Sequence, residues 1–379
     1  MDFSFTDDHL ALRDAVRRFC DGEYSATERG QAEPEAQAAQ RWNQIAQMGL
    51  TGLPLPAEHG GSAQGAVELM LVAQEFGRAL AGGPFIARVA LAGGLIARCG
   101  TEAQRARWLP GLADGSLRPA LAFEEDSLCH DITRVATRAV RDAEGWQIDG
   151  DKTLVIGGED ANLLLVLARV DGQPGDAGGL ALLAVEPGAP GLSVQGFATL
   201  DNRRAARVRL QAVRAPVDAE LGTAGPATEA VEAALDAANA ALVAEAVGAM
   251  DALLDQCCEH LRTRQQFGAP LARFQVLQHR IADLVIATEQ LKSMACAAAM
   301  AVDAGEPVQR RRIVSAAKQL AARWGRECGL QAIQMHGAMG MTDECRIGHY
   351  AKRLTVIGQI WGDAAFHLRR LGATPAGAA

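Results

Sequence analysis

The feature that most constrains the fold is that the spacing of apolar residues changes twice along the chain. Residues 1–115 carry apolar residues at helical spacing, residues 116–227 carry short apolar runs separated by turn signals, and residues 228–379 return to helical spacing. Closely spaced strands without long helical patterns between them predict a small β domain, an antiparallel sandwich or barrel. The sequence therefore predicts a mainly α protein with a central β domain between two helical domains.

The C-terminal part is predicted to be a helix bundle. Its four long segments with helical spacing are residues 228–262, 274–304, 308–337 and 350–371. Their length and short connections predict four antiparallel neighbours, a four-helix bundle. In the N-terminal part, we expect the helix over residues 103–109 to stop at Pro110, because proline lacks the backbone donor that a helix interior needs.

Composition narrows the possible partners and the compartment. The formal net charge is -8 and no basic stripe stands out, which argues against a nucleic-acid partner. The sequence contains no run of about 18 apolar residues, so it does not predict membrane insertion. The first residues do not resemble a signal peptide. The eight cysteines form no CxxC pair, so we expect reduced thiols, no metal site and a cytoplasmic location.

Two breaks in the C-terminal helical region carry residue types that bind anions. At Arg264 a helix ends, a Gly-Ala-Pro turn follows, and a new helix opens near Gln275, so basic and amide groups gather beside a helix N-terminus. The alternative is an ordinary solvated turn. At Gly337 and Gly340 a second helix breaks just after Gln334, and glycines there let a ligand approach the backbone. The alternative here is a glycine helix cap.

Together these motifs give the chain a family resemblance. They are residues 53–61 (LPLPAEHGG), residues 264–268 (RQQFG), Phe274-Gln275 with His279 and Asp283, and residues 334–340 (QMHGAMG). In this order, over nearly the full length, they resemble the acyl-CoA dehydrogenases. The resemblance implies an N-terminal helical domain, a β-barrel or sandwich, and a C-terminal four-helix bundle.

The resemblance also implies a cofactor and a reaction. FAD would lie at a subunit interface, with Arg264 and Phe267 reaching the FAD of a neighbouring subunit. Gln275, Gln334, Gly337 and Gly340 would hold its diphosphate and adenosine half. The implied reaction converts an acyl-CoA thioester to the trans-2-enoyl-CoA, with electrons passed to an electron-transfer flavoprotein or similar acceptor. The implied assembly is a dimer or tetramer.

The sequence departs from the family at the catalytic base. Most members place a glutamate directly before a glycine near the C-terminus, and the residue in register here is Trp361. A second group places it on the helix that leads to Arg264, where the residue in register is Ala238. Neither replacement accepts a proton. Two flavin contacts of the family also differ. Where the family has Trp-x-Thr beside the flavin ring, this chain has Leu154-Val155-Ile156. Where the family has a threonine before Glu-Pro, residues 122–125 of this chain read AFEE.

Other side chains could substitute for the base. Glu245 lies seven residues after Ala238 on the same predicted helical face, about 10 Å further along. It is either a buried base with a raised pKa or a carboxylate paired with an arginine or at a subunit contact. Asp363 and His367, four residues apart, are a second candidate, with a capping or solvated pair as the alternative. His336 is expected to support the site rather than act as the base.

The ending WGDAAFH, residues 361–367, resembles the smaller subunits of bacterial heteromeric acyl-CoA dehydrogenases of the pimeloyl-CoA and steroid side-chain types. That resemblance implies a paralogous partner subunit, with the base on one kind of subunit and a shared flavin. Two alternatives to a self-sufficient dehydrogenase therefore stay open. One is a catalytically incomplete subunit, and the other is a flavin-dependent oxygenase or oxidase on the same fold.

Overall fold

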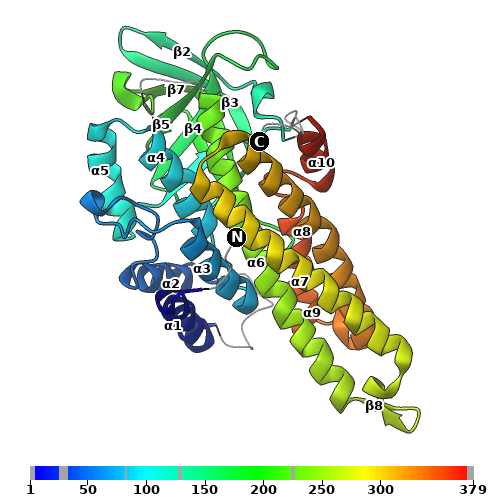
Figure 1. Ribbon diagram of the computed structural model, residues 1–379. Helices are drawn as coiled ribbons and strands as arrows, with labels where there is room; N and C mark the ends of the chain where they lie inside the picture. Colours follow the sequence, from blue (N-terminus) through cyan, green and yellow to red (C-terminus); the bar gives the residue numbers. More distant parts are fainter. Residues whose placement is uncertain (1–4, 25–32, 82, 127–129, 223–226, 374–379) are drawn as a thin grey trace.

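The computed structural model describes residues 5–24, 33–81, 83–126, 130–222 and 227–373 (Figure 1). It confirms the predicted order of a helical part, a β part and a second helical part. The helices of the first part are α1 (Asp7–Glu23), α2 (Glu35–Gln47), α3 (Ala66–Ala79), the π-helix η2 (Ile86–Gly93), α4 (Gly94–Cys99) and α5 (Glu102–Ala113). Short 3-10 turns lie at Ala57–His59, Ile132–Arg134, Val217–Ala219, Leu271–Arg273 and Gly337–Met341.

The N-terminal helices begin at side-chain caps. Thr6 accepts a hydrogen bond from the backbone N–H of His9, and Thr101 accepts one from Gln104, as N-cap threonines do. The expected stop at Pro110 is wrong, because α5 continues through it to Ala113. Burial of Trp108, Leu109 and Leu112 keeps the last turn helical although Pro110 cannot donate to the preceding turn.

The central domain is one curled sheet of seven strands. They are β1 (Pro119–Ala122), β2 (Arg138–Asp142), β3 (Gly145–Ile156), β4 (Leu163–Arg169), β5 (Leu180–Val185), β6 (Leu192–Ala198) and β7 (Arg204–Ala215). The order is β1-β4-β2-β3-β7-β6, with β5 also paired to β4. The purely antiparallel expectation is wrong, because β4 runs parallel to both β1 and β2. The continuous burial of β4 and β5 reflects coverage on both faces.

The C-terminal part contains α6 (Ala227–Thr263), α7 (Gln275–Ala304), α8 (Pro307–His336), α9 (Arg346–Ile357) and α10 (Ala364–Ala373). A short hairpin, β8 (Gln265–Gln266) and β9 (Ala269–Pro270), projects beyond the end of α6 (Figure 1). The single helix expected over residues 350–371 is wrong. The chain breaks between α9 and α10, where Trp361 and Gly362 adopt positive φ angles of 55° and 119°.

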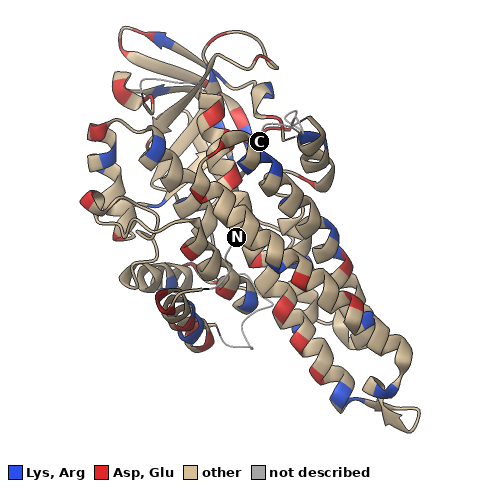
Figure 2. Ribbon diagram, in the orientation of Figure 1, with Lys and Arg blue, Asp and Glu red and all other residues tan. Residues whose placement is uncertain are grey.

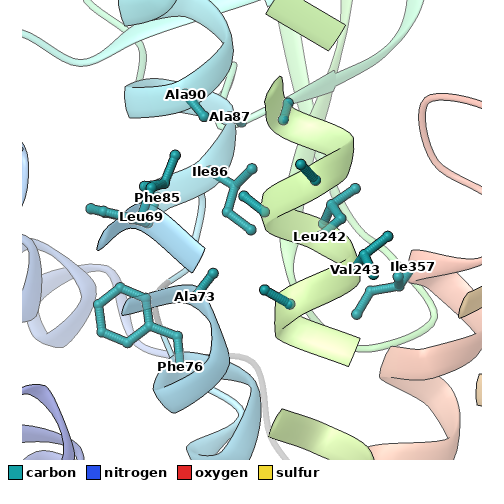
Figure 3. Close-up of a cluster of buried hydrophobic side chains, with 14 of the residues drawn as sticks. Leu69, Ala73, Phe76, Phe85, Ile86, Ala87, Ala90, Leu242, Val243 and Ile357 are labelled. Atoms are coloured by element: carbon teal, nitrogen blue, oxygen red, sulfur yellow. The ribbon is translucent and has the colours of Figure 1, made fainter. Parts of the chain in front are cut away.

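Helix α6 lies at the centre of the molecule and contacts both helical parts. Glycines at the crossing with α3, Gly77 and Gly248, bring the two backbones so close that a Cβ on either would collide with the facing main chain. Figure 3 shows Ile86 facing α6 from one side and Ile357 lying on the other. Helix α6 is long and apolar enough to cross a membrane, but 78% of its most apolar window is buried inside the protein.

Charge is distributed over all three parts. Figure 2 shows Lys and Arg interspersed with Asp and Glu on the helices and the sheet. Both signs therefore lie close together along the elements seen in this view.

Candidate active site

The break between α9 and α10 presents Trp361 to the interior. The residue is only 5% exposed, and its φ of 55° lies in the left-handed region that bulky side chains rarely adopt. Gly362 follows with a φ of 119°, which glycine tolerates. Asp363 then caps α10, with its Oδ1 accepting from the Phe366 N–H at 2.7 Å. The structure thus shows the capping alternative for Asp363.

Two buried side chains pin this turn. The Nδ2 of Asn239 donates to the Trp361 carbonyl at 3.1 Å. The Nζ of Lys318 donates to the carbonyls of Ile360 and Gly362, each at 2.9 Å. Lys318 is fully buried, and this burial lowers its pKa to about 7. Because α6 and α8 both bond the main chain around Trp361, the turn is fixed from two sides.

His367 fills the space behind the turn. Its ring lies so close to Gly362 that a Cβ on the glycine would collide with Nε2. Burial, together with the nearby cations Lys318 and Arg370, lowers the pKa of His367 to about 2. The side chain is therefore a neutral core imidazole at physiological pH, and a pKa this far below the working pH makes it too weak a proton acceptor for a general base.

Two cavities meet at Trp361. The first, called here the arginine cavity, has a volume of about 500 Å³ and lies between the β domain, the start of α6 and α10. Its charged lining residues are Glu124, His130, Asp131, Arg134, Glu232, Arg311, Arg369 and Arg370. Arg369 has no ion-pair partner in the described part of the chain. Arg134, Arg311 and Arg370 are paired with Asp131, Glu232 and Asp236, so Arg369 is the guanidinium group left to bind a phosphate-bearing ligand.

The second cavity, called here the three-domain cavity, has a volume of about 590 Å³. All three structural parts line it, from Trp42 and Arg88 through Ile156 to Arg353. Its apolar wall is formed by Leu80, Ala81, Pro84, Ile86, Ala87, Ile156, Leu242, Val356, Ile360 and Trp361. Six arginines also line it, and each is paired with a carboxylate, for example Arg204 with Glu159 and the buried Arg88 with Asp160. An apolar group is what this wall would accommodate.

Glu245 lies in a buried ion-pair network. Arg353 donates to both of its carboxylate oxygens, and Arg203 adds a hydrogen bond at 2.6 Å. Asp201 bonds Arg353 from the other side at 2.8 Å. Burial raises the pKa of Glu245, but the two arginines outweigh burial and the net pKa lies below its usual value. This is the paired alternative rather than a desolvated base.

The other residues considered for proton transfer are placed as follows. Ala238 is fully buried on α6, so the second usual base position is sealed in the core. His336 lies at the end of α8, where its ring stacks on His260 with centroids 4.2 Å apart and its Nδ1 contacts the Ala332 carbonyl. It therefore supports the end of α8 and lies away from Trp361, rather than beside the turn.

The predicted cofactor residues gather at the far end of the bundle. Phe267 is at the tip of the β8–β9 hairpin, 88% exposed and with a φ of 55°. Arg264 and Gln275 flank the hairpin and are also exposed. Gln334 is exposed at the end of α8, while Gly337 has a φ of 61° and Gly340 is buried. Phe267 and Arg264 thus offer an aromatic and a cationic side chain to whatever surface lies against the hairpin.

The cofactor residues cannot serve the cavities beside Trp361 in the same chain. Asn239, which bonds Trp361, and Thr263, next to Arg264, are 24 residues apart on α6. That separation corresponds to about 36 Å of helix, more than the diameter of a small domain. The hairpin group therefore fits a cofactor held mainly by another copy or another subunit, as the resemblance implies.

The wall that would face a flavin ring fits less well. Leu154 and Ile156, at the end of β3, offer no side-chain hydrogen bonds. Glu124 pairs with Leu154 through the backbone, and its Oε1 is buried without a hydrogen-bond partner, 3.6 Å from His130 Nδ1. FAD would thus be held on this side by backbone groups and apolar contact.

The sequence motifs did not identify three residues that contribute to the site. Asn239, Lys318 and His130 each line a cavity or anchor the turn, yet none belongs to the motifs. Lys318 did carry a signal, because it lies with Val314, Ala317 and Ala321 on one otherwise small and apolar helix face. For Asn239 and His130 we find no comparable signal.

Comparisons with known proteins agree along the whole chain. The acyl-CoA dehydrogenase N-terminal, middle and C-terminal domain models match residues 6–116, 120–213 and 228–373. The acyl-CoA dehydrogenase FadE12 of Mycobacterium tuberculosis is 31% identical over 347 residues, 90% of this chain and 89% of that protein. The acryloyl-CoA reductase (NADH) of Anaerotignum propionicum is 29% identical and covers 90% of this chain and 87% of that protein.

Solved structures are similar too. A variant of the steroid ACAD Tcur3481–Tcur3483 has a TM-score of 0.85 and 30% identity, covering 97% of both chains. The butyryl-CoA dehydrogenase of Megasphaera elsdenii has a TM-score of 0.89, covers 98% of this chain and 99% of that one, and is 22% identical, so this likeness concerns the fold.

Proposed function

This chain belongs to the acyl-CoA dehydrogenase family, and from that premise we propose that it works as a subunit without a catalytic base of its own. The reaction of the assembly is the α,β-dehydrogenation of an acyl-CoA thioester. The observation that carries the proposal is Trp361, a buried neutral side chain, which the family resemblance puts in register with the proton-accepting glutamate of most members.

The surrounding residues support the same conclusion. The second base position is Ala238, buried in the core, and Glu245 is held ionised by Arg203 and Arg353. A general base must reach the substrate proton and have a pKa near the working pH. A carboxylate already paired with two guanidinium groups meets neither condition, so we assign Glu245 to holding the three structural parts together.

The role of the chain in the assembly would then be to bind and orient. FAD, when bound, supplies the acceptor for the β-hydrogen. Arg264, Phe267, Gln275 and Gln334 would extend to the FAD of a neighbouring subunit, and Gly337 would let the diphosphate approach the main chain. Guanidinium groups of the arginine cavity would bind the phosphates of the thioester.

The base would come from a paralogous partner subunit. The similarity to the Tcur3481–Tcur3483 steroid ACAD, which is named for two polypeptides, supports this arrangement. An electron-transfer flavoprotein is the proposed acceptor of the electrons, and a cytoplasmic location is the compartment we propose. A bulky acyl group is compatible with the volume of about 590 Å³ in the three-domain cavity.

One experiment tests the proposal directly. The full chain is purified alone and together with the product of a neighbouring paralogous gene, and the flavin absorbance near its visible maximum is followed anaerobically with a panel of acyl-CoA thioesters. We expect bleaching only when the partner is present. Rapid bleaching by the chain alone would refute the base-less assignment, and thioester-independent oxygen consumption with a flavin reductase would instead support the oxygenase alternative.

A further inference from the structure

Trp361 separates the two cavities. The arginine cavity and the three-domain cavity share only one described lining residue, and that residue is Trp361. On α6, Asn239 lines the first cavity and Leu242, three residues later, lines the second. Residues three apart lie on the same face of a helix, so the two cavities adjoin one face of α6, one turn apart, with the tryptophan between them.

The two sides of this boundary differ in chemistry. The arginine cavity contains Arg369, which has no ion-pair partner in the described part of the chain, beside three paired arginines, and this free guanidinium group suits the anionic end of a ligand. On the other side of Trp361, the nearest lining residues along the chain and helix are Ile360, Val356 and Leu242, and they suit an alkyl or ring system. A thioester with a phosphate-bearing end and an apolar acyl end would have to pass the tryptophan to use both.

The tryptophan is fixed in place rather than poised to swing. Three hydrogen bonds hold the main chain around it, one from Asn239 and two from Lys318, and all of these donors are buried. The side chain belongs to the main hydrophobic core and is 5% exposed. Displacing the indole would require breaking core packing and the turn together, which makes it a wall and not a lid.

We propose that Trp361 is a partition that excludes the acyl chain of an acyl-CoA thioester from the three-domain cavity of this chain, while the arginine cavity still accepts the phosphate-bearing end. Loss of the base and closure of the acyl path are then consequences of one substitution. The inference rests on the proposed function only for the choice of ligand, because it concerns binding and not turnover.

The test replaces Trp361 and measures binding. Trp361→Gly suits the positive φ, which glycine adopts without strain, and it removes the whole partition. Trp361→Phe keeps an aromatic wall and is the matched control. Trp361→Ala is a second opening variant in case the glycine loosens the turn, and circular dichroism with a thermal melt verifies that each variant folds.

Calorimetry on the full chain, saturated with FAD, gives Kd values for CoA and for octanoyl-CoA. In the native chain and in Trp361→Phe, we expect the two Kd values to agree within about twofold, because the acyl chain stays in water. In Trp361→Gly and Trp361→Ala, we expect octanoyl-CoA to bind at least about tenfold more tightly than CoA, since several methylenes become buried. In a co-purified complex, the same switch is read as extra octanoyl-CoA bound per copy of this chain.

Two results would overturn the partition. One is a native chain that already binds octanoyl-CoA about tenfold more tightly than CoA, and the other is a folded opening variant with no gain in acyl selectivity. The outcome is separable from the base-less proposal, which is judged by flavin bleaching. Partner-dependent bleaching without a binding switch rejects only the partition, whereas a binding switch in a chain that bleaches alone rejects only the base-less assignment.

Discussion

Arg353 donates two hydrogen bonds to Glu245, from Nε to Oε1 at 2.8 Å and from Nη2 to Oε2 at 2.7 Å. This bidentate pair joins α9 to α6 in the core, and Arg203 connects it to the β domain and to the Ala81 carbonyl of the N-terminal part. A buried carboxylate in such a network holds domains in register, because removing one charge leaves the others unpaired.

Glu245→Gln is expected to destabilise the protein without abolishing any proton transfer. Leaving two buried arginines short of a partner should lower the free energy of unfolding by about 3 kcal/mol. Denaturant unfolding measures this, and α-proton exchange of acyl-CoA bound to the complex with the partner subunit should be unchanged in deuterated water at a temperature where the variant is folded. Glu259→Gln, an exposed position on the same helix, is the control and should change neither quantity. A strong loss of exchange specific to Glu245→Gln would restore the base assignment.

Arg264→Met is expected to weaken FAD binding with little effect on folding. If Arg264 bonds a phosphate of the FAD held by a neighbour, its loss removes a charge-assisted hydrogen bond and should raise the Kd for FAD by roughly tenfold or more. The flavin-to-protein ratio after gel filtration is the measurement, with the thermal melt of the flavin-free protein alongside. Arg262→Met removes an exposed charge two residues away and should retain flavin. Equal retention in both variants would contradict the hairpin assignment.

Stability is expected to fall at acidic pH through His367. Burial, with help from Lys318 and Arg370, lowers the pKa of this imidazole to about 2 in the folded state, while the unfolded value is near 6.5. Below about pH 6.5 the unfolded state takes up a proton that the folded state does not, so unfolding becomes easier as pH falls. At pH 5 the loss amounts to about 2 kcal/mol.

His367→Phe should remove that contribution. Melting temperatures between pH 7.5 and pH 5 should decline less steeply in the variant than in the native chain. His279→Phe, an exposed histidine on α7, should leave the slope unchanged. If the melting temperatures of the native chain and of His367→Phe fall equally between pH 7.5 and pH 5, the buried imidazole does not cause the loss of stability at acidic pH.

Gly362→Ala tests the geometry of the turn. The new Cβ would collide with His367 Nε2, and a φ of 119° is unfavourable for any residue with a Cβ. We expect a loss of about 3 kcal/mol from strain and overpacking together. Gly372→Ala on α10 meets open space and should be neutral or slightly stabilising. Equal stability of the two variants would mean that the turn can rearrange freely.

The sequence predicts the order of the structural parts better than the places where the helices break. The apolar periodicities of helices and strands are local properties of a sequence. The three structural parts and three of the long C-terminal helices can therefore be predicted from the spacing of apolar residues. The break after α9 does not, although Gly358 and Gly362 are both visible, because only the anchors Asn239 and Lys318 explain why the chain leaves the helix there. Those anchors come from other helices, and spacing carries no information about them.

The site shows the same limit. The assignment of Trp361 to the usual base position rests on the register of the motifs and stays a prediction. A seven-residue spacing correctly places Glu245 with Ala238 among the buried residues of α6. Its partners, Arg203 and Arg353, lie 42 and 108 residues away along the chain. A buried acid and an ion-paired acid look identical in a sequence, and only the tertiary contacts separate a raised pKa from a lowered one.

Trp361→Glu is the most demanding prediction. It places a carboxylate at the position that the family resemblance puts in register with the catalytic glutamate, and it also replaces the indole with a smaller side chain. With FAD bound, we expect anaerobic bleaching by acyl-CoA at least about a hundredfold faster than in Trp361→Gln, which has the same shape but accepts no proton. Equal rates in the two variants would show that geometry around the flavin, and not the missing base alone, limits this chain.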